Sequence, residues 1–166
     1  MRIDFSGRAH RHTPERLGPL EALGVPAPNE GRYHRLGEPR PLYASTTRAA
    51  AWKECARRLA RPLLRLGGHR MSTLLIREAP LLDLNDLHVL EELRVTRQDL
   101  LNDEDLMLTQ RLAQWARDEG LAGVIAPSAA DPEDPAAATI VIFADHLDRV
   151  SVEHESVEPF PEELLE

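Results

Sequence analysis

The chain has few aromatic residues, a single cysteine and an excess of acidic over basic residues, and these features exclude several classes of protein. Only 4% of the 166 residues are Phe, Trp or Tyr, so the core must consist mainly of Leu, Val, Ile and Ala. Because Cys55 is the only cysteine, the chain has no internal disulfide and no zinc site built from several cysteines. This cysteine content fits a reducing compartment.

The charge balance and the lack of long apolar runs argue against nucleic acid and membrane partners. The net charge is −8 at pH 7, whereas proteins that bind nucleic acid usually neutralise phosphates with an excess of Lys and Arg. No apolar run is long enough to span a bilayer, and the segment MRIDFSGRAHRH lacks the apolar core of a signal peptide. We therefore expect a cytoplasmic protein that contacts neither nucleic acid nor membrane directly.

Familiar nucleotide-binding and metal-binding motifs are also missing. The sequence has no Walker-type loop and no G-x-G-x-x-G, which disfavours P-loop and Rossmann proteins. Seven histidines occur, but no H-x-x-x-H pair lies on a predicted helix and no carboxylate has a fitting spacing. We expect no metal site.

Length and patterning predict one mixed α+β domain. A hydrophobic fraction of 42% and a charged fraction of 29% are typical of a globular protein, and the length fits a single domain. Because strands and helices alternate irregularly, an α+β fold is favoured over a regular α/β fold. Residues 1–155 are assigned to this domain and residues 156–166, which are acidic and contain two prolines, to a solvated tail.

Local patterns place the elements along the chain. Strands are predicted at residues 9–12, 41–45, 72–78, 81–84, 120–128, 138–144 and 149–155, and helices from Thr46 or Thr47 to about 60, at 86–93 and at 103–120. Pro80 is expected to bend the chain between two of the strands. In the helix at 103–120, acids are expected in the first turn, and Leu108, Leu112 and Trp115 form the apolar stripe.

The stretch GRYHRLGEPRPLYASTTRAAAWKE, at residues 31–54, concentrates groups that small-ligand sites use. Arg32 follows a glycine that lets the backbone approach a ligand, and its guanidinium can grip a pyrophosphate or a carboxylate. The alternative for Arg32 is a surface arginine. Tyr43 offers a ring face for stacking and a hydroxyl group, or else it is a core tyrosine. Tyr33 is open to a binding or a packing role.

Helical spacing separates Glu54 from the apolar side of its helix. Ala49, Trp52 and Leu59 share one face, and Glu54 lies about 200° around the helix from Trp52 at 100° per residue. One interpretation is an exposed glutamate that pairs with Arg58 four residues later. The other is a carboxylate that lines a cleft.

Ser128 follows Pro127 at the end of an apolar strand. Strand ends commonly carry site residues. No glycine pair surrounds this serine, so it does not belong to a nucleophile elbow of the G-x-S-x-G kind. The alternative is a serine that stabilises a turn.

Several segments, taken in order, resemble the RES domain family. They are the stretch at 31–54, then LDLNDLHVLEEL, then DEDLMLTQRLAQWARDEGLAGVIAPSA, then TIVIFADHL, and the resemblance covers roughly residues 8–150. The family is named for its recurrent Arg, Glu and Ser, and its members are toxins of RES–Xre toxin–antitoxin pairs. The resemblance implies a fold related to ADP-ribosyltransferases with an NAD-binding cleft.

The resemblance also implies a set of site residues. The family's arginine falls on Arg32, its tyrosine on Tyr43, its glutamate on Glu54, its serine on Ser128 and a more N-terminal strand arginine on Arg11. The implied reaction breaks the nicotinamide–ribose bond of NAD through an oxocarbenium-like transition state, which Glu54 would stabilise. Arg32 would fix the pyrophosphate, Tyr43 would stack on or orient the nicotinamide, and Ser128 would hydrogen-bond the ribose or the amide. With Tyr33 and Arg11, these residues form the expected NAD-binding set.

Two departures from the family pattern bear on this site. His34 stands where the family has an asparagine, and the arginine that often follows the P-S-A motif is replaced by Ala129 or Ala130. The segment PSAADPED adds acidic residues and prolines there, which can change access to the cleft.

Three functions remain open at this point. The leading expectation is an NAD-degrading toxin, acting by hydrolysis or phosphorolysis and neutralised by a helical Xre-type antitoxin. The alternatives are an ADP-ribosyltransferase that modifies one protein target and a catalytically inactive binding or regulatory module. NAD is the implied substrate in the first two cases.

Overall fold

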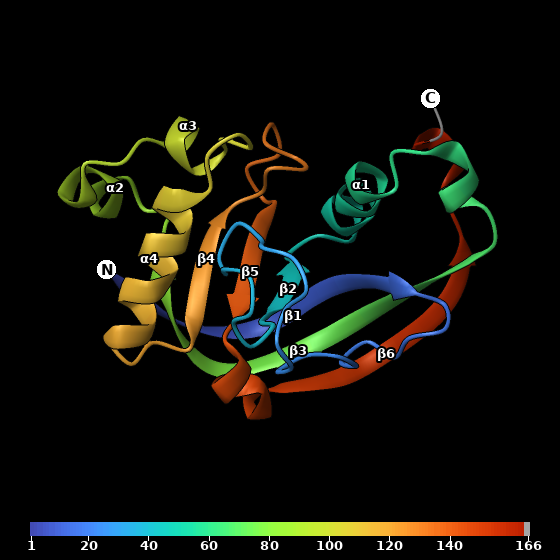
Figure 1. The fold of residues 1–166 in the computed structure, drawn as a ribbon, viewed down its shortest axis with the longest axis horizontal. Helices are drawn as coiled ribbons and strands as arrows, with labels where there is room; N and C mark the ends of the chain where they lie inside the picture. Colours follow the sequence, from blue (N-terminus) through green and yellow to red (C-terminus); the bar gives the residue numbers. More distant parts are fainter. Residues whose placement is uncertain (165–166) are drawn as a thin grey trace.

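Within the described residues, six strands form one curved sheet that closes on itself (Figure 1). The computed structural model describes residues 1–164, apart from the side chains of Pro62 and Leu64. The strands are β1 (Arg2–Pro14), β2 (Leu42–Ser45), β3 (Gly68–Asp83), β4 (Gly123–Pro127), β5 (Ala138–Ile142) and β6 (Val150–Pro159). Their order is β1-β2-β5-β4-β3-β6, and β1 also pairs with β3. Five strands therefore complete a ring, and β6 lies outside it.

The long antiparallel pair of β1 and β3 organises the sheet. Their register runs from Arg2 opposite Leu82 to Pro14 opposite His69, with an irregularity between Phe5 and Gly7. On its other edge, β3 pairs first with β6 and then, near its end, with β4 in parallel. One half of the pair thus belongs to the ring, while the other half extends beyond it beside β6 (Figure 1).

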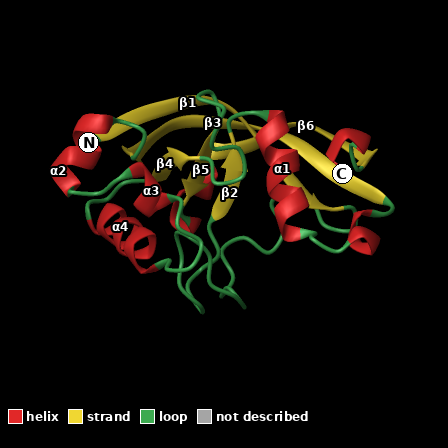
Figure 2. Ribbon diagram, turned by 90° about the horizontal axis from the view of Figure 1, so that it is seen from above, coloured by secondary structure: helices red, strands yellow, loops and turns green. Residues whose placement is uncertain are grey.

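Helices cover the two ends of the molecule. They are α1 (Arg48–Arg58), α2 (Leu87–Leu93), α3 (Arg97–Leu100) and α4 (Met107–Asp118), with short 3-10 helices η1 (Pro62–Arg65), η2 (Ala144–Arg149) and η3 (Glu162–Leu164). Figure 2 shows α2, α3 and α4 together at one end and α1 at the other. In the described part of the chain, no helix combines the length and the apolar character that crossing a membrane requires.

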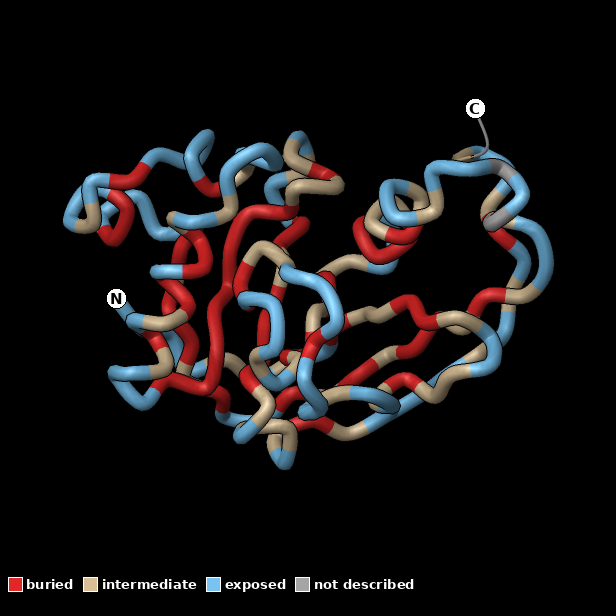
Figure 3. Tube along the Cα trace, viewed as in Figure 1, coloured by how far each residue is buried: buried red, intermediate tan, exposed pale blue. Residues whose placement is uncertain are grey.

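Three clusters of buried side chains form the core. One packs α2 and α4 against the sheet and includes Tyr33 and Phe143, and a second, inside the ring, includes Leu74 and Ile140. The third lies beneath α1 and contains Trp52, Cys55, Met71 and Phe160, with Ala51 beside them. Figure 3 shows buried stretches running through the centre of the molecule, along β4 and β5. The predominance of Leu, Ile, Val and Ala in these clusters agrees with the low aromatic content.

The predicted α+β class is confirmed, but several element boundaries were wrong. The strands predicted at 72–78 and 81–84 are one strand, β3, with no break at Pro80. Pro80 lies between the β6 pairing, which ends at Ile76, and the β4 pairing, which begins at Leu81, so its missing N–H removes no ladder bond on that edge. β1 is also much longer than the predicted 9–12, because it is held by pairing with β3 and not by its own apolar pattern.

The apolar stripes of the two longest helices are rotated from the predicted ones. In α1, Ala50 and Ala51 are buried with Trp52 and Cys55, whereas Ala49 is exposed. In α4, which starts after the predicted acidic turn, Trp115 is 37% exposed. Small residues face the sheet in both helices, because they let the helix axis approach it closely.

The acidic residues before α4 form turns and are not part of the helix. The side chain of Asn102 accepts from the backbone N–H of Glu104 at 2.9 Å, and that of Asp105 accepts from Met107 at 2.9 Å. Asp and Asn side chains compete in this way with helical hydrogen bonds. As a result, Asp103 lies on a loop and is free to contact distant residues.

The last strand continues past its predicted end at 155. Residues 156–159 complete β6, and the buried ring of Phe160 lies edge-on to Trp52 at a centroid distance of 5.8 Å. The beginning of the segment assigned to a solvated tail is therefore part of the sheet and core. Of that segment, residues 165–166 lie outside the described part of the chain.

Candidate active site

An open cavity of about 500 Å³ lies between α1, β1, β2 and the loops at 29–41 and 103–106. Five of the six predicted site residues line it: Arg11, Arg32, Tyr33, Tyr43 and Glu54. They come from β1, the 29–41 loop, β2 and α1, which are brought together by the closure of the sheet. Ser128 is not among the lining residues, although its neighbours Pro127 and Ala129 are.

Ser128 stabilises a turn. Its side chain is buried, with the residue 1% exposed, and its hydroxyl accepts a hydrogen bond from the backbone N–H of Asp131 at 3.1 Å. The carboxylate of Asp131 in turn binds the ammonium group of Lys53 on α1 at 2.9 Å. The turn after β4 is thereby tied to the helix that carries Glu54.

Tyr43 and His34 hold the loop around Gly31 through a directed series of hydrogen bonds. His34 Nε2 lies 2.9 Å from the carbonyl oxygen of Asn29, so this nitrogen donates, and in the neutral ring Nδ1 accepts. The hydroxyl of Tyr43 then donates to His34 Nδ1 at 2.7 Å and accepts from the N–H of Tyr33 at 3.0 Å. His34, which replaces the family's asparagine, therefore has a defined structural role here.

Gly31 is required by this arrangement. A Cβ atom at position 31 would lie 2.3 Å from His34 Cε1 and 2.9 Å from the hydroxyl oxygen of Tyr43. Burial raises the pKa of the Tyr43 phenol, which keeps its proton available for His34.

Tyr33 touches the cavity, but its side chain belongs to the core. The ring is buried in the cluster that also contains Phe143. Its hydroxyl has no hydrogen-bond partner among the described residues. Of the two roles considered for Tyr33, packing therefore accounts for its side chain. Its backbone N–H donates a hydrogen bond to the hydroxyl of Tyr43.

Replacing Tyr43 by Phe should lower the free energy of unfolding by about 1–3 kcal/mol, because the N–H of Tyr33 and Nδ1 of His34 lose a buried partner. The matched control is Tyr33→Phe, which removes a hydroxyl that has no partner and should be neutral or slightly stabilising. Urea unfolding of both variants measures the difference. Equal loss of stability in the two variants would contradict the hydrogen-bond assignment.

Arg32 binds the loop before α4. Its Nη1 donates to the carbonyl oxygens of Leu100 at 2.9 Å and Asn102 at 2.8 Å, and its Nη2 forms an ion pair with Asp103. Asp103 also accepts from Arg57 Nη2, with 2.9 Å to each oxygen. Burial by itself raises the pKa of Asp103, but hydrogen bonds and charges from Arg57 and Arg32 outweigh it and lower the pKa. Much of the donor capacity of Arg32 is thus used within the protein.

Glu54 faces the cavity with little restraint. Its side chain is 45% exposed, and among residues 1–164 its one ion-pair partner is Arg57, three residues later, at 3.9 Å. The alternative pairing with Arg58 is therefore not observed. Such a long contact leaves both carboxylate oxygens available to a ligand.

The cavity carries more positive charge than the sequence analysis anticipated. Besides Arg11 and Arg32, it is lined by Arg40, Arg57 and Arg58. Burial, followed by the charges of Arg58 and Arg40, lowers the pKa of Arg11 to about 10, so these guanidinium groups lie near one another. The sequence contained a signal for Arg57 and Arg58, because positions 54, 57 and 58 have the i, i+3, i+4 spacing of one helix face.

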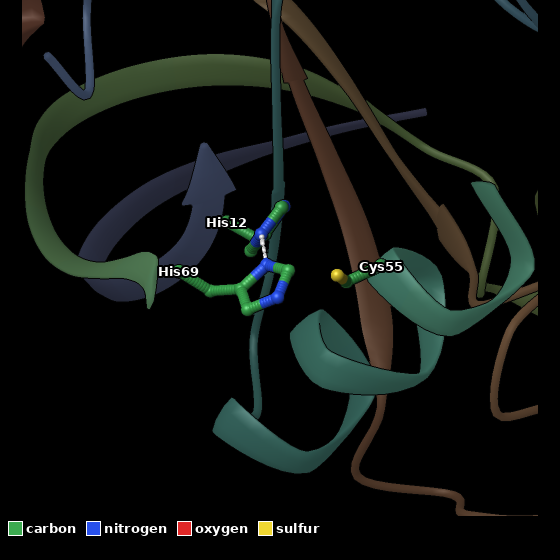
Figure 4. Close-up of side chains that lie close together, drawn as sticks. All are labelled: His12, Cys55 and His69. Carbon is green, nitrogen blue, oxygen red and sulfur yellow. Dashed lines mark hydrogen bonds between the residues drawn. The ribbon is translucent and has the colours of Figure 1, made fainter. Parts of the chain in front are cut away.

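A cluster of possible metal ligands adjoins the cavity, which one of its members, His12, lines. His12, Cys55 and His69 offer ligand atoms within 4.8 Å of one another, and all three are buried (Figure 4). In this structure the two imidazoles hydrogen-bond each other at 2.9 Å. Burial raises the pKa of the Cys55 thiol to about 11, which disfavours the thiolate that binds metals.

The chain is similar to proteins of known family and fold. The RES domain matches residues 6–162. A protein named probable NAD(+) phosphorylase Rv3189, from Mycobacterium tuberculosis, is 34% identical over 152 residues, which cover 88% of this chain and 69% of that protein. The crystal structure of the M. tuberculosis MbcT–MbcA toxin–antitoxin complex contains a similar fold, with a TM-score of 0.79 at 17% identity over 95% of this chain and 87% of the other. From the extent of the domain match and the identity to this relative, the chain belongs to the RES domain family.

Proposed function

We propose that this chain degrades NAD by cleaving the bond between nicotinamide and ribose, and that it is the toxin of a toxin–antitoxin pair. The observation that carries the proposal is the cavity, which presents the weakly restrained carboxylate of Glu54 beside several arginines. Its volume of about 500 Å³ is within the range of small-molecule sites. The similarity to a probable NAD(+) phosphorylase supports NAD as the substrate.

Glu54 would stabilise the ribose as the bond to nicotinamide breaks. The bonding electrons leave with the nicotinamide, which departs as a neutral base, and positive charge develops on the ribose as in glycoside cleavage. A carboxylate held nearby lowers the energy of that charge and can also accept a hydrogen bond from a ribose hydroxyl. Since nicotinamide needs no proton to leave, the reaction requires no acid partner and, in this proposal, no metal ion.

The other residues would bind and orient the substrate. Arg11 and Arg40 would face the pyrophosphate, because neither has a carboxylate within ion-pair distance among residues 1–164. Arg11 is held in place by hydrogen bonds to the backbone carbonyl oxygens of Pro19 and Tyr43. Tyr43 offers its ring to the nicotinamide while its hydroxyl holds the loop at His34. Arg32 acts mainly by holding the loop with Asp103 at the rim.

We propose phosphorolysis, in which an oxygen of inorganic phosphate forms the new bond to the ribose. The basic cavity is suited to hold a phosphate ion as the acceptor, and the relative's name supports the same reaction. Hydrolysis and transfer of ADP-ribose to a protein use the same bond cleavage with a different acceptor.

The test is incubation of the purified chain with NAD, with and without inorganic phosphate, followed by chromatography and ³¹P NMR. We expect nicotinamide and a phosphorylated ADP-ribose, formed only when phosphate is present. Unphosphorylated ADP-ribose in both samples would indicate that the reaction is hydrolysis and not phosphorolysis. A labelled protein band in cell extract would indicate a transferase, and unchanged NAD would refute the proposed activity.

For the partner, we propose an antitoxin that covers the cavity, of the helical Xre type. A solved toxin–antitoxin complex contains a chain of this fold, which supports a partner of that kind. Co-purification of the chain with the product of a neighbouring gene tests the pairing. An antitoxin that binds while NAD still enters the cavity would contradict the covering role.

A further inference from the structure

Arg58 differs from its neighbour Arg57 in having no acidic partner. Both line the cavity, and Arg57 binds Asp103 and lies near Glu54. In the described part of the chain, no carboxylate lies within ion-pair distance of Arg58. Among the residues that the structure describes, its one hydrogen bond joins Nη2 to Nδ1 of His12, at 3.2 Å.

The contacts behind Arg58 determine where each imidazole proton lies. His69 Nε2 is 2.9 Å from the carbonyl oxygen of Arg65, which only accepts, so Nε2 carries the proton. In a neutral imidazole Nδ1 then accepts. It accepts a hydrogen bond from the N–H at Nε2 of His12, at 2.9 Å, which is the bond drawn in Figure 4. His12 Nδ1 is left to accept from Arg58. The series runs in one direction, from a guanidinium at the cavity to the partly buried backbone carbonyl of Arg65.

The surroundings keep the imidazole of His12 neutral. Trp52 and Cys55 of α1 pack against His12 from one side, and the charged groups near it are Arg58 and Arg11, both cationic. Burial, then Arg58, His69 and Arg11, lower the pKa of His12 to about 3. A metal ion on His12 Nε2 would place the proton on Nδ1, directly opposite the N–H of Arg58, and would add a further positive charge.

A neutral acceptor orients a guanidinium without neutralising it. A carboxylate in the place of His12 would cancel the charge of Arg58, whereas Asp103 offsets only part of the charge of Arg57 because Arg32 shares it. The histidine series ends on a carbonyl and contributes no negative charge, so the positive charge remains available in the cavity. Arg11 lies near both Arg58 and Arg40, and neither Arg11 nor Arg40 has a carboxylate partner among residues 1–164.

We propose that Arg58 binds a phosphate group of the substrate in this cavity, and that His12 and His69 are positioning residues that hold its guanidinium there. The proposal rests on the proposed function for the identity of the ligand, a dinucleotide with a pyrophosphate. It assigns to the pyrophosphate an arginine outside the residues that the family resemblance implies.

The test measures binding, so that it does not depend on turnover. Calorimetry with ADP-ribose and with adenosine, which has no phosphate, gives the contribution of the pyrophosphate. We expect Arg58→Gln to weaken ADP-ribose binding by about 10- to 100-fold, the range for a charge-assisted hydrogen bond, and to leave adenosine binding unchanged. Arg61→Gln removes an exposed charge outside the cavity and is the matched control.

A double-mutant cycle tests the positioning role. His69→Leu, which removes the acceptor for His12, should weaken ADP-ribose binding when Arg58 is present and have little effect in the Arg58→Gln background. His69→Gln, which keeps an acceptor and a donor, should restore most of the affinity. Equal effects of His69→Leu in both backgrounds would refute positioning through Arg58.

Nitrogen-15 NMR of the wild-type histidines decides the case if His69→Leu does not fold. We expect the ring proton of each histidine on Nε2, and we expect His12 to remain neutral down to pH 5. Titration of His12 near pH 6.5, or a proton on Nδ1 of either ring, would overturn the assignment. ADP-ribose binding that is absent or independent of Arg58 would overturn the phosphate role. Arg58-dependent binding without NAD cleavage would instead leave this proposal standing and refute the proposed reaction.

Discussion

Replacing Glu54 by Gln should reduce the rate of NAD cleavage by about 10²–10³-fold, the usual cost of removing a group that stabilises transition-state charge. The amide keeps the size of the side chain and can still hydrogen-bond a ribose hydroxyl, but it carries no negative charge. We therefore expect most of the loss in kcat and little change in KM. The rate of nicotinamide release at saturating NAD and phosphate measures the loss in kcat.

The fold should tolerate this change. Glu54 is half-exposed, and its single ion pair, at 3.9 Å from Arg57, contributes a few tenths of a kcal/mol at most. Glu30 provides the matched control, because it also lines the cavity but accepts a hydrogen bond from Gln110 at 3.1 Å. Glu30→Gln should retain most of the activity. Full activity of Glu54→Gln would remove the central residue of the proposed mechanism.

Replacing Gly123 by Ala should cost at least about 3 kcal/mol of stability, the upper end of the usual overpacking range. A Cβ atom there would lie 1.7 Å from the carbonyl oxygen of Val141 and 2.8 Å from its carbonyl carbon. Both atoms belong to the backbone of β5, so no side-chain rotation relieves the contact. Because domains of this size are stable by about 5–15 kcal/mol, the variant should unfold at much lower urea or fail to accumulate.

A glycine in open space provides the comparison for Gly123. Gly37 has a φ of +84° and no atom within 4 Å of an added Cβ, so Gly37→Ala pays only for the backbone conformation, about 1–2 kcal/mol. The urea midpoints of the two variants separate the cost of steric overlap, at position 123, from the cost of the backbone conformation, at position 37. A Gly123→Ala variant as stable as the wild type would mean that β4 and β5 pair differently. The turn after β4, which borders the cavity at Pro127 and Ala129, would then also be misplaced.

The sequence predicted the kinds of elements better than their ends. Helix α1 was expected to end before Pro62 and to begin at a threonine cap, and Thr47 does accept from the N–H of Ala50 at 3.1 Å. These signals are local, since a cap and a proline act within one turn. The long strands were underestimated because β1 and β3 are stabilised by each other, over separations that local patterns do not report.

The candidate site was predicted in part. The family resemblance brought Arg32, Tyr43 and Glu54 to one place, and all three line the cavity. It gave no indication that Arg32 would bind Asp103, which is 71 residues away. Ser128 was expected among the binding residues, but its hydroxyl is used by the turn that follows β4. Side chains near a ligand site also have structural partners, and only the packed structure shows which of the two uses prevails.

By itself, the sequence determined the class of the fold, the approximate places of most strands and of helices α1, α2 and α4, and the position of Glu54 away from Trp52 on its helix. These properties follow from periodicity and from short motifs, which act between residues that are close along the chain. The tertiary structure decided three further features. They are the pairing of β1 with β3, the hydrogen-bonded series of Arg58, His12 and His69, and the two ion pairs of Asp103 with Arg32 and Arg57. Each of these contacts joins residues dozens of positions apart. Hydrogen bonds and ion pairs act only between groups that are already close, so these contacts depend on how the backbone folds.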